Sequence, residues 1–368
     1  MRRPLAPLWM AGATRFAGAS RIRAGLAAGA LLLLLIAAMA TPGPMRAPDA
    51  PAGIEHTTDV VTYDGIIEGI RAGGNYYQLA ADTLRAGADP VRPFVTFRLP
   101  LHSVVQARLP RFASLLLLFL LVVAVMVAWW KRLAPLFRRG APRAVAMVLL
   151  AGGTLAFVQP DRVGLHESWA APLVALSLAL RRPGRWVEAV ALALIALLVR
   201  ETAVLYVLAM AGMAWVDGER REAAGWGAAM GMFALVLGVH AHAVAQVTGP
   251  LDPITPMWNV QLGLGFFLDA VAQSTVLAAA PTPLALLLGV LCFAGWTAAT
   301  DPLSRRVAAV VATYAAAISL FARAETFHWA MMIAPMFLVG LAFLPDLARD
   351  LGHAILDRPR VRVQRVSR

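Results

Sequence analysis

Long apolar runs constrain this chain of 368 residues more than any other feature. A helix needs ~20 apolar residues to cross ~30 Å of hydrocarbon, so such runs predict membrane-spanning helices. The composition agrees: 60% of the residues are hydrophobic and 15% are charged, whereas soluble domains are ~45–50% apolar. A soluble enzyme, a disordered tail and a fibrous protein are excluded. The runs lie at 24–40, 112–130, 144–158, 168–180, 186–199, 202–216, 227–247, 281–299, 306–321 and 328–345.

We therefore predict an all-α polytopic membrane protein with about ten transmembrane helices. Residues 1–23 form a basic cytoplasmic N-terminus, 24–348 the membrane domain, and 349–368 a basic cytoplasmic tail. The first run has an alternative interpretation as a signal peptide, because Ala38-Met39-Ala40 resembles a cleavage site. Its long arginine-rich leader favours an uncleaved helix.

The basic residues predict the orientation. All 33 except Lys131 are arginines, and the net charge is +12. Cytoplasmic loops of membrane proteins carry an excess of such residues, so we attribute this charge to topology and expect no nucleic-acid partner. Both termini are then cytoplasmic, in a bacterial inner membrane. The clusters placed inside lie at 131–143, 181–185, 220–221, 305–306 and the C-terminus.

Residues 186–216 allow two topologies, because Arg200-Glu201 interrupts two short apolar halves. As one helix, 31 residues would extend ~46 Å, well beyond the hydrocarbon thickness. Two short helices that meet at Arg200-Glu201 on the outer side preserve the orientation of the later arginines, and we prefer them. The alternative is one span here and a further crossing at 261–279.

The first outer loop, 41–111, is long for a membrane connection and is expected to be structured. Helical spacing at 58–72 places Tyr63 with isoleucines on one stripe, and Asp64, Glu68 and Arg71 on another. A second amphipathic helix is predicted at 76–86. Such helices would lie at the interface and cover a cavity. The alternative for the charged stripe is a solvated face with an ion pair.

Ionisable residues recur in four predicted outer segments, which suggests a polar cavity open to that side. The spacing of the histidines supplies no metal site, and a single cysteine, Cys292, excludes a cysteine-based one. We therefore expect no cofactor, and a divalent metal has no sequence support. The candidate substrate-binding residues are Glu68, Tyr77, Arg98, His166, Glu167, Arg200, Glu201, Arg323, Glu325 and His328.

Several segments resemble one type of membrane enzyme. They are Tyr63-Asp64, the Gly-Gly-Asn-Tyr-Tyr of 73–77, the Arg-Pro-Phe-Val-Thr-Phe-Arg-Leu-Pro of 92–100, the His-Glu-Ser-Trp of 166–169 and the Arg-Glu break at 200–201. With a long first outer loop and many spans, the chain resembles the glycosyltransferase C superfamily in layout.

This resemblance implies transfer of a sugar from a polyprenyl-phosphate donor to a glycan, lipid or protein acceptor on the periplasmic side. An acceptor hydroxyl needs a carboxylate base, for which Asp64 is the candidate and Glu68 and Asp59 are alternatives. Arg200, Arg323 and His328 would neutralise the departing lipid phosphate. Two other functions fit the same charges: a transporter or flippase for a lipid-linked or anionic substrate, and a non-catalytic subunit of an envelope-polysaccharide assembly system.

Overall fold

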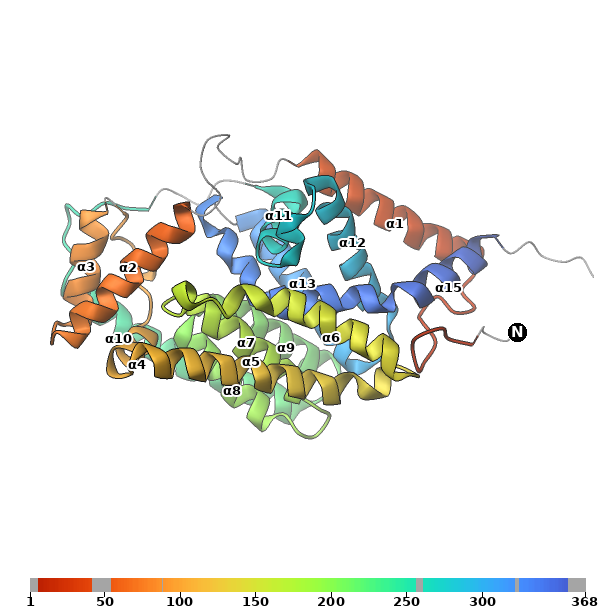
Figure 1. Ribbon diagram of the computed structural model, residues 1–368, viewed down its shortest axis with the longest axis horizontal. Helices are drawn as coiled ribbons and strands as arrows, with labels where there is room; N and C mark the ends of the chain where they lie inside the picture. The colour runs from red at the N-terminus through yellow and green to blue at the C-terminus, as the bar shows by residue number, and fades with distance from the viewer. Residues whose placement is uncertain (1–5, 42–53, 88, 256–260, 322–323, 357–368) are drawn as a thin grey trace, which may run out of the picture.

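The computed structural model describes residues 6–41, 54–87, 89–255, 261–321 and 324–356, with side chains omitted at 54–59 and 324–326. Within these ranges the chain is helical and contains isolated β-bridges but no strand (Figure 1). Six segments are long and apolar enough to cross a membrane. They are α1 (Arg21–Ala40), α5 with its 3-10 extension (Arg111–Leu136), α6 with its extension (Gly140–Phe157), α10 (Arg220–Ala245), α13 (Pro302–Phe321) and Phe327–Leu356.

Five other apolar helices are shorter. α7 (His166–Leu180), α8 (Val187–Val199) and α9 (Val204–Val216) have 15, 13 and 13 residues, and α11 (Gly263–Gln273) and α12 (Thr282–Ala298) have 11 and 17. The ten predicted apolar runs are all helical, and α11 lies within 261–279, which only the alternative topology treated as a crossing. At ~1.5 Å per residue, α8 and α9 each extend only ~20 Å.

Five connecting segments meet at one end of the molecule, with several arginines in or directly beside them. We call this the basic end (residues 6–19, 134–139, 181–186, 217–219 and 299–301). The N-terminal segment pairs there with the α5–α6 turn through the Met10–Phe137 bridge. Asp346 of α15 (Leu344–Leu356) accepts the backbone N–H groups of residues 8–10. These contacts connect the first and last described segments of the chain.

The opposite end is covered by the segment between α1 and α5, which we call the cap (residues 54–110). It contains α2 (Ile54–Arg71), α3 (Tyr76–Ala86), the 3-10 turn η1 (Phe94–Thr96) and α4 (Leu101–Arg108). α3 begins at Asn75, whose side chain accepts the N–H groups of Tyr77 and Gln78. Figure 1 shows the cap at the end of the long axis opposite to the N-terminus.

Three short helices each have one terminus at the same level beneath the cap. α7 begins there at His166, α8 ends at Val199, and α9 begins at Val204 after the 3-10 turn η5 (Glu201–Ala203). The two-helix interpretation of 186–216 is confirmed, because α8 begins and α9 ends at the basic end. The indole of Trp129 on α5 donates to the carbonyl of Ala175 on α7. Trp129 lies about nine residues farther from the start of its helix than Ala175 does, so α5 begins ~13 Å closer to the cap than α7. The cap occupies the end above these helices.

The last apolar segment is not the continuous α-helix that its hydropathy predicts. It passes through η7 (Ala324–Ile333), α14 (Ala334–Phe337) and η8 (Leu338–Phe343) before α15. The indole N–H of Trp296 on α12 donates to the carbonyls of Met336 and Phe337. Backbone groups freed by an irregular helix must find such partners within the protein.

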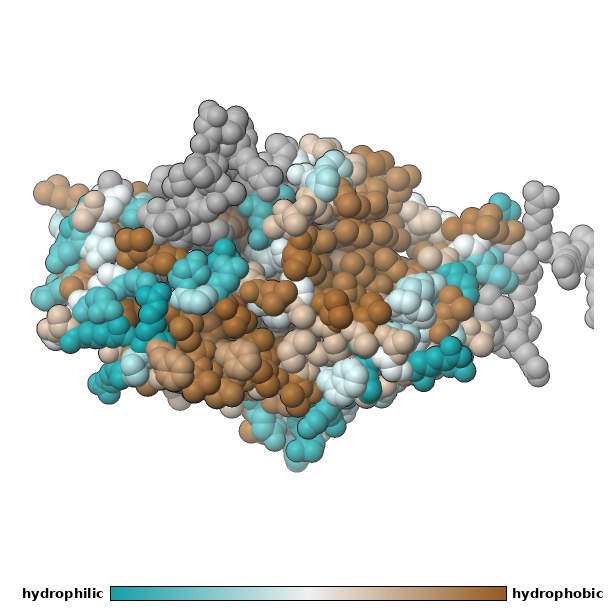
Figure 2. Space-filling view, in the orientation of Figure 1, coloured by the Kyte–Doolittle hydropathy of each residue, from teal (hydrophilic) through white to brown (hydrophobic). Residues whose placement is uncertain are grey.

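Glycines bring this segment close to its neighbours. A Cβ built on Gly340 would lie 2.0 Å from the carbonyl oxygen of Cys292, and one on Gly153 would lie 2.2 Å from that of Ala334. The segment is the most buried candidate span, at 78%, whereas α1 is 11% buried. α1 therefore lies on the periphery, where apolar side chains form part of the brown band between two hydrophilic ends (Figure 2).

Candidate functional site

The candidate site is a group of charged side chains beneath the cap, at the level where the short helices end. Arg200 follows the last residue of α8 in extended conformation and is 1% exposed. Its Nε lies 2.5 Å from Oε1 of Glu167 on α7, and its Nη1 lies 3.4 Å from Oε2 of Glu201. His328 on η7 approaches the same Glu167 oxygen, with its Nε2 3.7 Å away. The structure thus brings together four of the predicted residues.

The cap reaches this group through its extended segment at 97–100. The backbone N–H of Leu99 donates to Oε1 of Glu201 at 2.9 Å, and the Nε of Arg98 donates to the hydroxyl of Tyr63 at 3.2 Å. Tyr76 donates to the carbonyl of Arg98 at 2.5 Å. Glu201 is therefore shared between Arg200 and the cap, which couples the cap to the buried charges.

Two histidines line the boundary between the cap and α7. His102 on α4 lies 4.5 Å from His166, and Tyr63 lies 4.7 Å from it, between ring centroids. His166 is 1% exposed, and neither of its ring nitrogens has a hydrogen-bond partner in the described structure. The hydroxyl of Ser168 and Nη2 of Arg200 also lack one. Buried polar groups are nearly always satisfied by protein, water or ligand. This cluster of unsatisfied polar groups therefore indicates a binding site for a polar ligand.

Burial determines the protonation of His102. It is 4% exposed, and desolvation lowers its pKa to about 4. The negative charge of Glu167 raises the pKa, but by less than desolvation lowers it. His102 is therefore neutral near pH 7 and can accept as well as donate a hydrogen bond. Its Nε2 contacts Nε2 of Gln106 at 3.3 Å, while its Nδ1 has no partner among the described residues.

Asp64 lies at the edge of the site. Its Oδ2 is 3.6 Å from Nη1 of Arg111 at the start of α5, and its side chain is 34% exposed. Its other oxygen faces Gly164, where a Cβ would lie only 2.5 Å from it. Partial burial raises the pKa of Asp64, as does the charge of Glu68, while Arg111 and Arg71 lower it. A carboxylate with a raised pKa is better suited to accept a proton than an ordinary aspartate.

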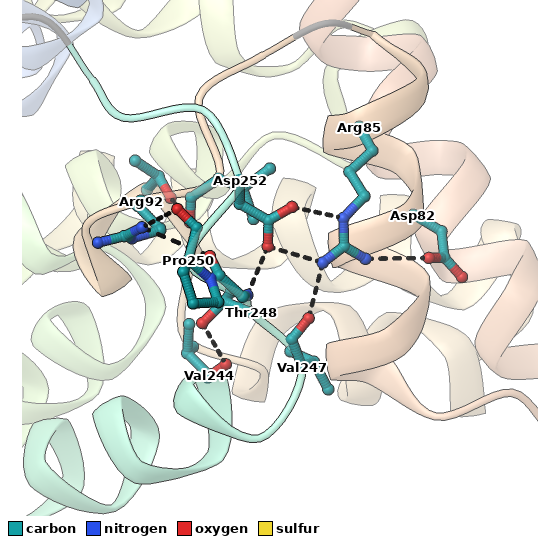
Figure 3. Close-up of polar contacts among 11 residues, drawn as sticks. Asp82, Arg85, Arg92, Val244, Val247, Thr248, Pro250 and Asp252 are labelled. Carbon is teal, nitrogen blue, oxygen red and sulfur yellow. Dashed lines mark hydrogen bonds and ion pairs between the residues drawn. The ribbon is translucent and has the colours of Figure 1, made fainter.

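The cap is fastened on its far side to the end of α10. Arg85 forms two hydrogen bonds with Asp252, at 2.9 and 2.8 Å, and a third with the carbonyl of Val247 (Figure 3). Arg92 donates to the carbonyl of Pro250 at 2.8 Å in the same view. The pKa of Asp252 is held at about 2, first by the hydrogen bond from Arg85 and then by the N–H of Gly249. We call this set of contacts the strap.

Other predicted residues lie elsewhere. Tyr77 contacts Nδ1 of His240 on α10 at 3.2 Å, so it joins the cap to α10. Glu68 is exposed and pairs with Arg71 at 2.5 Å, as the alternative interpretation of that stripe expected. Arg71 also donates to the carbonyls of Gln106 and Leu109, which attaches α2 to α4. Arg323 and the side chains of Glu325 and Asp59 fall outside the described residues.

Sequence reasoning missed two participants. His102 carries a signal, because it shares a face of α4 with Gln106 in an otherwise ordinary polar helix. Tyr63 was placed on the apolar stripe of α2, where its ring does lie, but its hydroxyl accepts from Arg98. Nothing in the sequence indicates that these residues meet, because they come from separate elements.

The site has acidic, basic and neutral hydrogen-bonding groups. In the described part of the chain, no group of three or more His, Cys, Asp or Glu side chains could hold a metal ion. Arg98 and Arg200 can bind an anionic group, and Asp64 can accept a proton, because these are the chemistries of guanidinium and carboxylate.

A scan of family models, a search of curated proteins and a search of solved structures each returned no match to this chain.

Proposed function

We propose that this chain is a membrane glycosyltransferase that moves a sugar from a polyprenyl-phosphate donor to an acceptor hydroxyl beneath the cap. The observation that supports the proposal is the set of buried polar groups of Arg200, His166 and Ser168 that have no hydrogen-bond partner among the described residues. An anionic ligand rich in hydroxyl groups would form hydrogen bonds with these groups.

In the proposed reaction, the oxygen of the acceptor hydroxyl attacks the anomeric carbon of the donor sugar, and Asp64 accepts the proton of that hydroxyl. The bond between that carbon and the phosphate oxygen breaks, and the lipid phosphate leaves with the electron pair. Arg200, with Arg98, stabilises the new phosphate charge. Glu167 and Glu201 keep Arg200 in place before the donor binds, and His166 and Ser168 contact the sugar.

The topology follows the same proposal. The basic end faces the cytoplasm, because arginine-rich turns stay on that side of a bacterial inner membrane, and the cap faces the periplasm. α7, α8, α9 and α12 cross as sheltered short spans, which gives ten crossings. The donor lipid reaches the site from the bilayer.

The test is sugar transfer by the purified chain in nanodiscs, with a panel of polyprenyl-phosphate sugars and loss of donor as the readout. Donor consumption by the wild type is expected to disappear in Asp64→Asn. The matched control is Asp82→Asn, which removes a carboxylate that is 76% exposed on α3 of the cap. Full activity in Asp64→Asn would contradict the assignment of the base.

One observation favours a second function, that of a non-catalytic subunit. Several of the described charges around the cap are paired: Glu167 and Glu201 with Arg200, Asp64 with Arg111, Glu68 with Arg71 and Asp252 with Arg85. A purely structural network would look like this. Donor binding by a well-folded sample without turnover would favour a transporter, and neither binding nor turnover would favour the subunit.

A further inference from the structure

The basic end has a pocket that plays no part in the proposed reaction. It has a volume of about 280 Å³ and is lined by Arg15, Met213, Thr297, Arg305 and Ala308. The N-terminal segment, α9, α12 and α13 each contribute to its wall. Two guanidinium groups and a hydroxyl thus stand beside apolar side chains in one hollow.

The positive charge around this pocket exceeds the negative charge. Asp217 at the end of α9 pairs with both Arg305 and Arg306, the latter at 2.7 Å, and Glu222 pairs with Arg181 at 2.5 Å. Among the described residues, no carboxylate lies within 4 Å of the guanidinium of Arg15. The wall of the pocket itself contains two arginines, Arg15 and Arg305, and no carboxylate.

Arg306, the buried neighbour of Arg305 in the chain, has unused donors. Arg306 is 1% exposed, and its Nε and Nη2 make no hydrogen bond within the described residues; Glu222 is 3.8 Å from Nη2. The buried Nε of Arg305 is also without a partner there. Leaving charged donors unpaired in a buried place is costly, and Arg305 lines the pocket, so an anion bound there would stabilise its guanidinium.

The pocket also lies where lipid head groups would be. Trp215 and Val216, at the end of α9, are 62% and 78% exposed, and the guanidinium of Arg220 lies 3.7 Å above the ring of Trp215. Exposed tryptophan beside arginine is typical of the boundary between hydrocarbon and head groups. Met213, one turn before Val216, gives the pocket an apolar wall on the side of the span.

We propose that this pocket binds the phosphate head group of an anionic membrane lipid. Arg15 and Arg305 contact the phosphate, the neighbouring Arg306 adds positive charge, and Met213 and Ala308 pack against the start of the acyl chains. The excess arginines select an anionic lipid over a zwitterionic one. The site thereby connects the N-terminal segment to α9 and α13 through a bound lipid.

The test is native mass spectrometry of the full chain in detergent, titrated with phosphatidylglycerol and, in parallel, with phosphatidylcholine. Wild type is expected to bind phosphatidylglycerol at least tenfold more tightly. At about 1 kcal/mol per arginine, Arg15→Gln should weaken this binding about fivefold, and Arg305→Gln by a similar factor. Arg139→Gln, an exposed arginine at the same end, is the matched control and should bind like wild type.

Arg15→Gln keeps the test decisive even if Arg305→Gln fails to fold. Arg15 is exposed, and its Nε makes a long hydrogen bond of 3.4 Å to the carbonyl of Ala299, so its substitution should leave the fold intact. Equal binding by Arg15→Gln and Arg139→Gln would overturn the site. A thermal-shift arm with inorganic phosphate distinguishes the two sources of phosphate. Full protection by inorganic phosphate at the same concentration would overturn the lipid assignment in favour of a soluble anion.

Discussion

The two ends of the molecule both bury arginine beside glutamate, but they do so differently. At the basic end, Arg181 and Glu222 form two hydrogen bonds, at 2.9 and 2.5 Å, and are 3% and 1% exposed. Beneath the cap, Arg200 lies between Glu167 and Glu201, and the ring nitrogens of nearby His166 have no hydrogen-bond partner among the described residues. The first arrangement is a bidentate pair, whereas the second is a loose group with donors to spare.

This difference separates a structural role from a functional one. A bidentate arginine–carboxylate pair is the strong form of the interaction, and the turns of the basic end depend on it. A group that must bind and release a ligand cannot be fully satisfied without it. We therefore expect substitution in the Arg181–Glu222 pair to reduce stability, and substitution in the group around Arg200 to reduce binding of a ligand beneath the cap.

The largest expected effect is at the basic end. Glu222→Gln removes the charge that faces Arg181 and leaves that arginine buried without an anion, at a cost of about 3–5 kcal/mol in the free energy of unfolding. Thermal unfolding in detergent measures it. Glu219→Gln, exposed in the preceding turn, is the control. Equal melting of the two variants would show that the pair is not structural.

Acid should weaken the cap before the basic end. Unfolded His102 takes up a proton near pH 6.5, whereas in the folded chain its pKa is about 4, so the unfolding free energy falls as the pH drops between these values. The loss reaches about 3 kcal/mol at pH 4. Melting curves from pH 7 to 4 should show it in wild type and not in His102→Gln. Asp217 at the basic end contributes nothing in this range, because Arg306 lowers its pKa against the effect of partial burial.

The strap provides a sharper test of where acid acts. The pKa of Asp252 is about 2, so its bond to Arg85 persists down to pH 4 and is lost only below. Asp252→Asn weakens the strap at every pH instead. Proteolysis of the cap at pH 7 should therefore be faster in Asp252→Asn than in wild type. If wild type at pH 5 already behaved like Asp252→Asn at pH 5, the strap would be the acid-sensitive element.

The smallest stability effect is expected at Asp64. Because burial raises its pKa, the ionised carboxylate disfavours folding slightly above pH 4, and Asp64→Asn should be as stable as wild type or more so, by less than ~1 kcal/mol. The same substitution is expected to abolish sugar transfer. A large loss of stability would instead identify the pair with Arg111 as structural.

The helices were predictable from the sequence because long apolar runs have few alternatives. The break at Arg200-Glu201 was predictable too, since two charges in an apolar stretch need a polar place. The irregular helix after Phe327 was not, because its contacts with Gly153 and Trp296 come from helices that are distant in the sequence.

For the candidate site, the structure brings some of the predicted residues together and places others elsewhere. Glu167, Arg200 and Glu201 were expected on one face of the membrane, and they do meet. Glu68 was expected at the site, but the neighbouring turn of α2 gives it Arg71 instead. Local pairing of this kind is visible in sequence, whereas the approach of α4 to α7 is not.

The short helices have an electrical consequence. In the topology that we propose, α8 would extend ~20 Å into the membrane from the basic end, which would place Arg200 about two thirds of the way through a ~30 Å hydrocarbon layer. An anion that reaches it from the cap side would cross roughly a third of the transmembrane voltage. At ~2.3 kcal/mol per charge per 100 mV across the full layer, that amounts to roughly 0.8 kcal/mol. An energised membrane, negative in the cytoplasm, would thus oppose entry of the anion and assist its departure.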